Sequence, residues 1–128
     1  MEMNLLKVTS FEPDLLEYPS AWIGHSPFSQ WIMRSVRPDI FVELGTHHGH
    51  SYFSFCQAVR ELGLPSKCFA INTWSGDDHA GFYGDEVFSS VNAYHKKHYS
   101  KFSRLLRMSF DNAVAYFADG SINLLHID

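Results

Sequence analysis

The chain has 128 residues and a mass of 14.7 kDa, which is the size of one folded unit or of a piece of one. Its hydrophobic content of 45% and charged content of 19% are close to those of globular proteins and exclude disordered, collagen-like and coiled-coil chains. The net charge of −4 at pH 7 gives no electrostatic footprint for a polyanion, so nucleic acid is not an expected partner.

The cysteine content and the N-terminal residues indicate in which cellular compartment the protein is expected. Cys56 and Cys68 are too few for a disulfide framework and stand in no CxxC pair, so we expect free thiols. The first residues, MEMNLLKVTSFEPD, lack the positive charge of a signal peptide, and no apolar run approaches the roughly 18 residues of a membrane span. We therefore expect a soluble cytoplasmic protein with no membrane partner, and an N-terminal arm or cover over residues 1–25.

From residue 26 onward the pattern predicts a regular α/β unit. Ser26 and Pro27 suit the start of a helix that Pro38 ends. The apolar run Ile40–Leu44 is typical of a strand buried on both faces, and Gly49 precedes a helix of about 13 residues.

The remaining pattern continues this alternation. Its predicted elements are a strand at Cys68–Ile71, a helix over 87–98, a strand at Arg104–Met108, a helix from Ser109 to Gly120 and a strand at Ile122–Ile127. A long loop at 73–86, rich in Gly, Asp and His, follows the first of these strands. Strands alternating with helices imply a doubly wound parallel sheet, in which ligands bind outside the carboxyl ends of the strands.

The segment Glu43–Ser51, ELGTHHGHS, joins a predicted strand to a predicted helix. Gly45 permits a positive φ, and Gly49 opens the helix without a Cβ, so the exposed amides suit polar or anionic groups of a ligand. The spacing fits neither the GxGxxG of dinucleotide-binding folds, which disfavours a NAD or nucleotide-sugar site, nor the P-loop. An acid followed by Gly-x-x-x-Gly resembles the first motif of the class I S-adenosylmethionine-dependent methyltransferases.

The resemblance covers roughly residues 26–128 and implies a partial Rossmann-like cofactor-binding domain. VELGTHHGHSYFSFC, AINTWSGDDHAGFYGDEVF and LLHID resemble the subgroup linked to O-methylation of sugars, polysaccharides and macrolides. It therefore implies methyl transfer to a hydroxyl of a sugar, a glycan precursor or another small acceptor. Because such methyltransferases have about seven strands, the chain resembles their N-terminal part, truncated after strand four.

The resemblance also implies roles for individual residues. Glu43 and the amides of the Gly45–Gly49 loop, which includes Thr46 and His47, would hold the methionine end of S-adenosylmethionine. Asn72 stands where the family has an Asp or Glu that binds the ribose; an amide donates and accepts hydrogen bonds but lacks the charge.

Four further residues belong to this candidate site. Trp74 either stacks on adenine or acceptor or plugs the sheet, and His79 is a candidate general base. Ser109 and Phe110 lie where relatives contact the adenine, although capping of the next helix explains Ser109 equally well.

Asp128 occupies the position that metal-dependent relatives use to bind a divalent cation such as Mg²⁺, which would lower the pKa of an acceptor hydroxyl.

Two questions stay open at this level. The chain is either the cofactor-binding half of an enzyme or a non-catalytic, truncated methyltransferase-like interaction module, and the exposed edge of strand four invites a homo-oligomer. The basic residues near the third strand form either a local basic patch or the solvated end of a helix. They are Lys96, Lys97, Lys101, Arg104 and Arg107.

Overall fold

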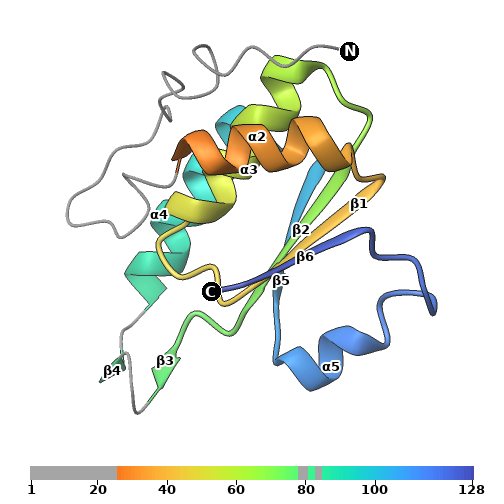
Figure 1. Ribbon diagram of the computed structural model, residues 1–128. Coiled ribbons are helices and arrows are strands. Elements are labelled where there is room, and N and C mark those ends of the chain that lie inside the picture. Colours follow the sequence, from red (N-terminus) through yellow and green to blue (C-terminus); the bar gives the residue numbers. More distant parts are fainter. Residues whose placement is uncertain (1–25, 78–80, 83–84) are drawn as a thin grey trace.

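The computed structural model describes residues 26–77, 81–82 and 85–128 (Figure 1). Its elements are α2 (Ser26–Val36), β1 (Ile40–Leu44), α3 (His50–Leu62), β2 (Lys67–Asn72), β3 (Gly76–Asp77), β4 (Gly81–Phe82), α4 (Asp85–His98), β5 (Ser103–Arg107), α5 (Phe110–Val114) and β6 (Leu124–Ile127). The expected arm at 1–25 and the candidate base His79 lie outside the described residues. No helix in the described part is long and apolar enough to cross a membrane.

The main sheet has four strands in the order β5-β2-β1-β6, and every neighbouring pair is parallel. The chain builds outward from β1 through β2 to β5 and then returns to the other side of β1 for β6. This order confirms the predicted doubly wound sheet. It also places the switch in strand order between β1 and β6, where such folds bind ligands at the carboxyl ends of the strands.

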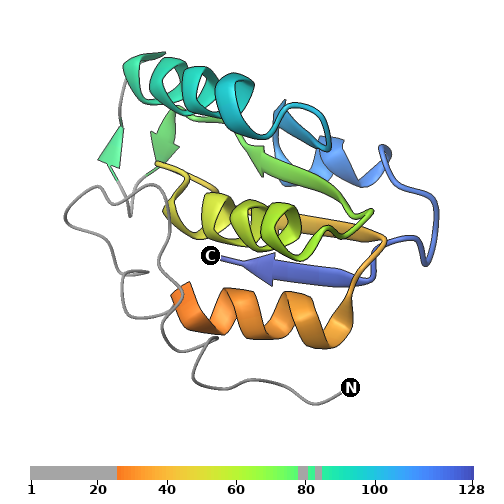
Figure 2. The ribbon, with the colours of Figure 1, turned by 90° about the horizontal axis from the view of Figure 1, so that it is seen from above.

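Helices cover both faces of the sheet. α2, α3 and α4 lie on one face, with α3 between the other two, and α5 lies on the opposite face (Figures 1 and 2). The alternation along β1 separates the two cores: Phe41 packs on Phe55 of α3, with 4.6 Å between ring centroids, while Val42 faces a second cluster that includes Ala113 of α5.

The C-terminal elements are shorter than predicted. α5 ends at Val114 because Tyr116 and Phe117 donate their amides to carbonyls three residues back, which tightens the chain into turns. β6 begins at Leu124 rather than at Ile122. Just before it, the Asn123 side chain accepts a hydrogen bond from the backbone amide of Ile40 at 2.9 Å and so replaces a strand bond.

Further boundaries differ from the prediction: β2 spans Lys67–Asn72 rather than Cys68–Ile71, and α4 begins at Asp85 rather than at residue 87. The third strand begins one residue earlier, at Ser103. The loop after β2 contains a short antiparallel pair, β3 and β4, in which Gly76 lies opposite Phe82 and Asp77 opposite Gly81. The Gly and Asp content of this loop gave no alternating apolar pattern from which the two strands could be predicted.

Candidate functional site

The loop between β1 and α3 depends on glycine at both ends. Gly45 has a φ of +85°, and a Cβ there would stand 3.1 Å from the backbone oxygen of Asp128. Gly49 has a φ of +91°, and a Cβ there would come within 2.6 Å of the Phe53 ring. Between them the Gly49 amide donates to the Thr46 carbonyl at 2.9 Å. The loop is therefore a tight turn that the end of β6 approaches closely.

Glu43, the acid of the motif, is completely buried and connects α3 to β6. Its Oε2 accepts hydrogen bonds from Ser51 Oγ at 2.7 Å and from His126 Nδ1 at 2.9 Å. Burial raises the pKa of Glu43, and these two hydrogen bonds oppose the rise; the bond to Glu43 in turn raises the pKa of His126. Glu43 therefore holds the first turn of α3 against β6.

Two buried polar atoms beneath the loop belong to residues that interact with each other, since a hydrogen bond from Thr46 is one of the interactions that lower the pKa of Glu43. They are Glu43 Oε1 and Thr46 Oγ1. A buried acid that accepts hydrogen bonds from Ser51, His126 and Thr46 is held in one position under the glycine loop.

Asn72, the last residue of β2, and Trp74, two residues later, support the loop. Asn72 Oδ1 accepts from the backbone amide of Trp74 at 2.7 Å, which leaves the Asn72 amide hydrogens as donors. Trp74 is fully buried and packs on Phe88 at 5.0 Å between ring centroids, and its Nε1–H donates to the His47 carbonyl at 2.7 Å. The indole is thus a plug that joins two loops, and a stacking contact with a ligand would require it to leave this position.

Two of the three non-glycine residues that have a left-handed backbone in the described ranges lie at this edge, and the third, Arg37, precedes β1 at the opposite edge. His47 has a φ of +51° and Trp74 a φ of +55°, in the left-handed region that non-glycine residues rarely adopt. Such conformations cost of order 1–3 kcal/mol each and persist where the surroundings fix them, often at functional sites. Here the bond from the indole to the His47 carbonyl links the two residues.

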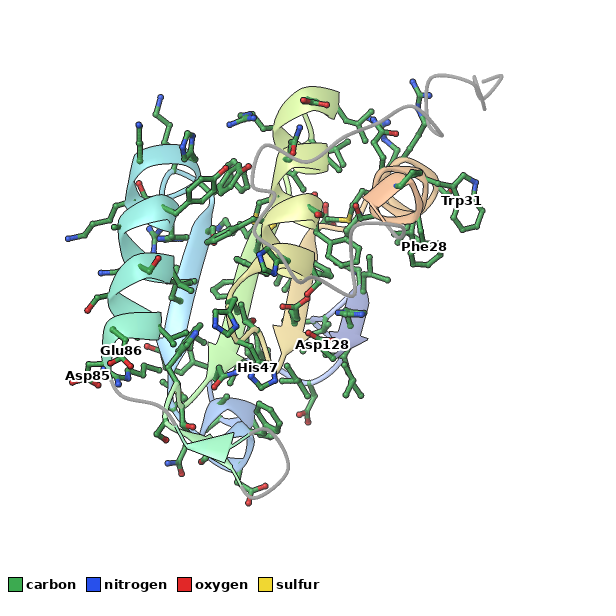
Figure 3. All side chains as sticks on the ribbon, turned by 90° about the vertical axis from the view of Figure 1, so that its left-hand side faces the viewer. Phe28, Trp31, His47, Asp85, Glu86 and Asp128 are labelled. Atoms are coloured by element: carbon green, nitrogen blue, oxygen red, sulfur yellow. The ribbon has the colours of Figure 1, made fainter. Side chains whose placement is uncertain are left out.

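The other predicted residues lie along the same carboxyl edge. Figure 3 shows His47 and Asp128 close together there, and the Asp128 amide donates to the Leu44 carbonyl at 3.0 Å. Ser109 caps α5 by accepting from the Asn112 amide at 3.2 Å, which agrees with the capping interpretation, and Phe110 beside it is half exposed. Within the described ranges no group of three or more His, Cys, Asp or Glu could hold a metal ion.

Sequence reasoning missed two members of this site, Ser51 and His126. The signal that could have found them is the burial expected of Glu43, since a buried acid needs donors from neighbouring elements. Arg107 bears on the two alternatives left open for the basic residues near the third strand. Instead of joining a basic patch it pairs with Asp85 and lies over the Phe88 ring at 4.5 Å.

Fold and site together define an α/β protein with a glycine turn and a buried acid at the switch point of a parallel sheet. The sequence profile of the family described as "Methyltransferase domain" matches residues 42–128, so the chain belongs to this methyltransferase family. The uncharacterized protein y4gI of Sinorhizobium fredii (strain NBRC 101917 / NGR234) is 49% identical over 127 residues. That match covers 99% of this chain but 14% of the relative.

Solved structures show the same fold at low identity. The SAH-bound methyltransferase PaMTH1 of Podospora anserina aligns with a TM-score of 0.63 and 13% identity, over 97% of this chain and 47% of that one. The O-methyltransferase TomG of Streptomyces achromogenes, in complex with SAM, aligns with a TM-score of 0.61 and 13% identity, over 97% of this chain and 52% of that one. The chain thus has the Rossmann-like fold of S-adenosylmethionine-dependent methyltransferases and spans about half of these structures.

Proposed function

We propose that this chain binds S-adenosylmethionine at the carboxyl edge of β1 and β2 and forms the cofactor-binding part of an enzyme that methylates a hydroxyl of a sugar or another small acceptor. The observation that carries the proposal is the buried Glu43, which holds Ser51 and His126 beneath a glycine turn. Family membership and the titles of the structural neighbours support the same cofactor.

The chain's own groups would act mainly by positioning. The Gly45–Gly49 turn would approach the methionine end of the cofactor closely, but the Gly45 and Gly49 amides already donate to the Ile71 and Thr46 carbonyls, so the Ser51 hydroxyl fixed by Glu43 is the polar group that we assign to this end. The free amide hydrogens of Asn72 suit one ribose hydroxyl, with neutral hydrogen bonds in place of charged ones.

When bound, the sulfonium group of S-adenosylmethionine supplies an electrophilic methyl group. Holding an acceptor oxygen in line with it accounts for much of the rate enhancement of such a reaction. The acceptor proton must pass to a base, and His79 is our candidate because it belongs to the loop that follows β2.

A divalent cation does not fit the described residues. Asp128 is a single exposed carboxylate, and hard cations such as Mg²⁺ need several oxygen ligands. We therefore assign no step to a metal. The buried free thiols of Cys56 and Cys68 support a reducing, cytoplasmic location for the reaction.

Calorimetric titration of the 128-residue chain with S-adenosylhomocysteine tests the cofactor site without an acceptor. We expect saturable binding that tightens about tenfold in Asn72→Asp, because a carboxylate makes charge-assisted hydrogen bonds and keeps the acceptor for the Trp74 amide. Gly45→Ala should bind at least tenfold more weakly. Gly120→Ala is the matched control, since Gly120 has a φ of +70° but no atom within 4 Å of its Cβ position. No saturable binding in the wild type and in Asn72→Asp would refute the proposal.

An interaction module is the second candidate function, and the exposed apolar residues at the free edge of β6 favour it. Leu125 is 47% exposed and Ile127 is 69% exposed. An edge strand of this kind pairs readily with another chain. Light scattering would show a stable dimer that Leu125→Lys dissociates, whereas a monomer that binds S-adenosylhomocysteine would exclude self-association through this edge.

A further inference from the structure

A basic groove lies at the end of the molecule away from the candidate cofactor site. It has a volume of about 540 Å³ and runs between the C-terminal turns of α3 and α4. In Figure 3 these turns lie at the opposite end of the molecule from His47 and Asp128. The groove has an apolar part that includes Val59, Leu64 and Phe102. Its basic side chains are Arg60, Lys96, Lys97, His98 and Lys101.

A second pocket extends the positive surface. It has a volume of about 240 Å³, shares Lys101 and Phe102 with the groove, and adds Lys67 and Arg104. The two cavities together are lined by six of the chain's ten Lys and Arg residues, and among the residues that the structure describes no Asp or Glu lines either cavity. In a chain with a net charge of −4, this is a strong local segregation of charge.

Hydrogen bonds to carbonyls account for Arg104, whose Nη1 donates to the Ser100 and Ser103 carbonyls, but not for the lysines. Lys96 and Lys97 also lie in the last turn of α4, where the helix dipole favours cations. The last carbonyls of α3 are already bonded, because the Gly63 amide donates to Arg60 O at 3.2 Å and the Leu64 amide to Val59 O at 3.0 Å. At the end of α4 the Tyr99 amide donates to the His95 carbonyl at 2.8 Å.

The lysines of the groove are also not compensated by acids. Across the part of the chain that the structure describes, no ion pair involves Lys96, Lys97 or Lys101. Like charges held at one groove repel one another, and an anion bound between them would remove that repulsion. The groove is therefore better suited to a ligand with several negative charges than to a neutral ligand.

We propose that this groove binds a ligand with a chain of two or more phosphates. Lysine ammonium groups are point charges that engage phosphate oxygens from several directions. The volume lies within the range of about 300–1,000 Å³ that small-molecule sites occupy. A nucleoside or another organic group attached to the phosphates would contact the apolar part of the groove, whereas inorganic polyphosphate would bind through the cations alone.

The test is a calorimetric titration of the 128-residue chain with inorganic tripolyphosphate and, separately, with adenosine triphosphate. We expect saturable binding of at least one of them that weakens as salt is raised, because exposed charges are screened. Tighter binding of the nucleotide would assign the site to nucleoside polyphosphates, and equal binding would assign it to the phosphate chain itself. No saturable binding of either ligand at low salt overturns the proposal.

Variants locate the binding. Lys96→Gln with Lys101→Gln should weaken it at least tenfold. Arg34→Gln with Arg37→Gln on the α2 side removes the same charge away from the groove and should leave affinity unchanged. An equal loss in both double variants would mean that only net charge matters and would refute a site. Independently of any variant, the Gly63 amide resonance should shift during the titration and that of Gly120 should not.

Discussion

Replacing Gly49 by alanine separates two costs that the structure assigns to this position. Gly49 and Gly63 cap the two ends of α3, and both have left-handed backbones, with φ of +91° and +64°. An alanine in this conformation costs about 1–2 kcal/mol at either position. Only at Gly49 would the new Cβ also meet a buried ring, 2.6 Å from Phe53, whereas nothing lies within 4 Å at Gly63.

The extra cost at Gly49 should be that of overpacking a core, about 1–3 kcal/mol. We therefore expect Gly63→Ala to lower the free energy of unfolding by about 1–2 kcal/mol and Gly49→Ala to lower it by about 2–5 kcal/mol. Urea unfolding of the two variants beside the wild type measures the difference directly. Equal losses in the two variants would show that Phe53 moves aside freely and would refute the steric argument.

Three further predictions concern the core and the edge of the sheet. Ser103→Ala should cost about 2 kcal/mol or more in urea unfolding, because it leaves the buried Tyr52 hydroxyl and His95 Nε2 without their shared partner; no loss would contradict this. Burial lowers the pKa of His95 below 6.5, so the native state takes up fewer protons than the unfolded state as the pH falls through 6.5. The contribution of His95 to stability should therefore decline from pH 7 to 5, whereas His126, whose pKa is raised, contributes with the opposite sign. His95→Gln should remove the His95 contribution and shift the slope of stability against pH accordingly; identical slopes in the variant and the wild type would refute this. Asn123→Ala should cost about 1 kcal/mol through the lost bond to the Ile40 amide, whereas Asn123→Asp keeps the acceptor and should cost less.

The parts of the fold that local pattern determines could be predicted from the sequence. β1 occupies Ile40–Leu44 as predicted, since a short run that is apolar except for Glu43, between a proline and a glycine, permits few other structures. α3 begins after Gly49 and ends before Gly63, because a glycine at each end bounds the helical pattern. The end of α5 depended instead on the competition between helical and turn hydrogen bonds after Val114, for which apolar periodicity gives no signal.

The residues of the candidate site also fall into two groups, those that local sequence predicts and those that only the tertiary structure brings together. Gly45 and Gly49 could be predicted because their spacing lies within one segment of the chain. The partners of Glu43 could not, since His126 is 83 residues away and reaches it only through the pairing of β6 with β1. The basic groove combines both cases: Lys96 and Lys97 are adjacent in sequence, but Arg60 joins them through the packing of α3 beside α4.

The two edges of the sheet differ in how their polar groups are arranged, and the two proposed sites should differ accordingly. At the carboxyl edge, strained residues and a buried acid are held by interactions within the protein: Trp74 fixes the His47 carbonyl, and Glu43 fixes Ser51. Such a site is preorganised before a ligand arrives and suits a cofactor that must be oriented. At the amino edge, lysines such as Lys97 have no ion-pair partners in the described structure and attract anions mainly through charge. Salt should therefore weaken binding at the amino edge far more than at the carboxyl edge.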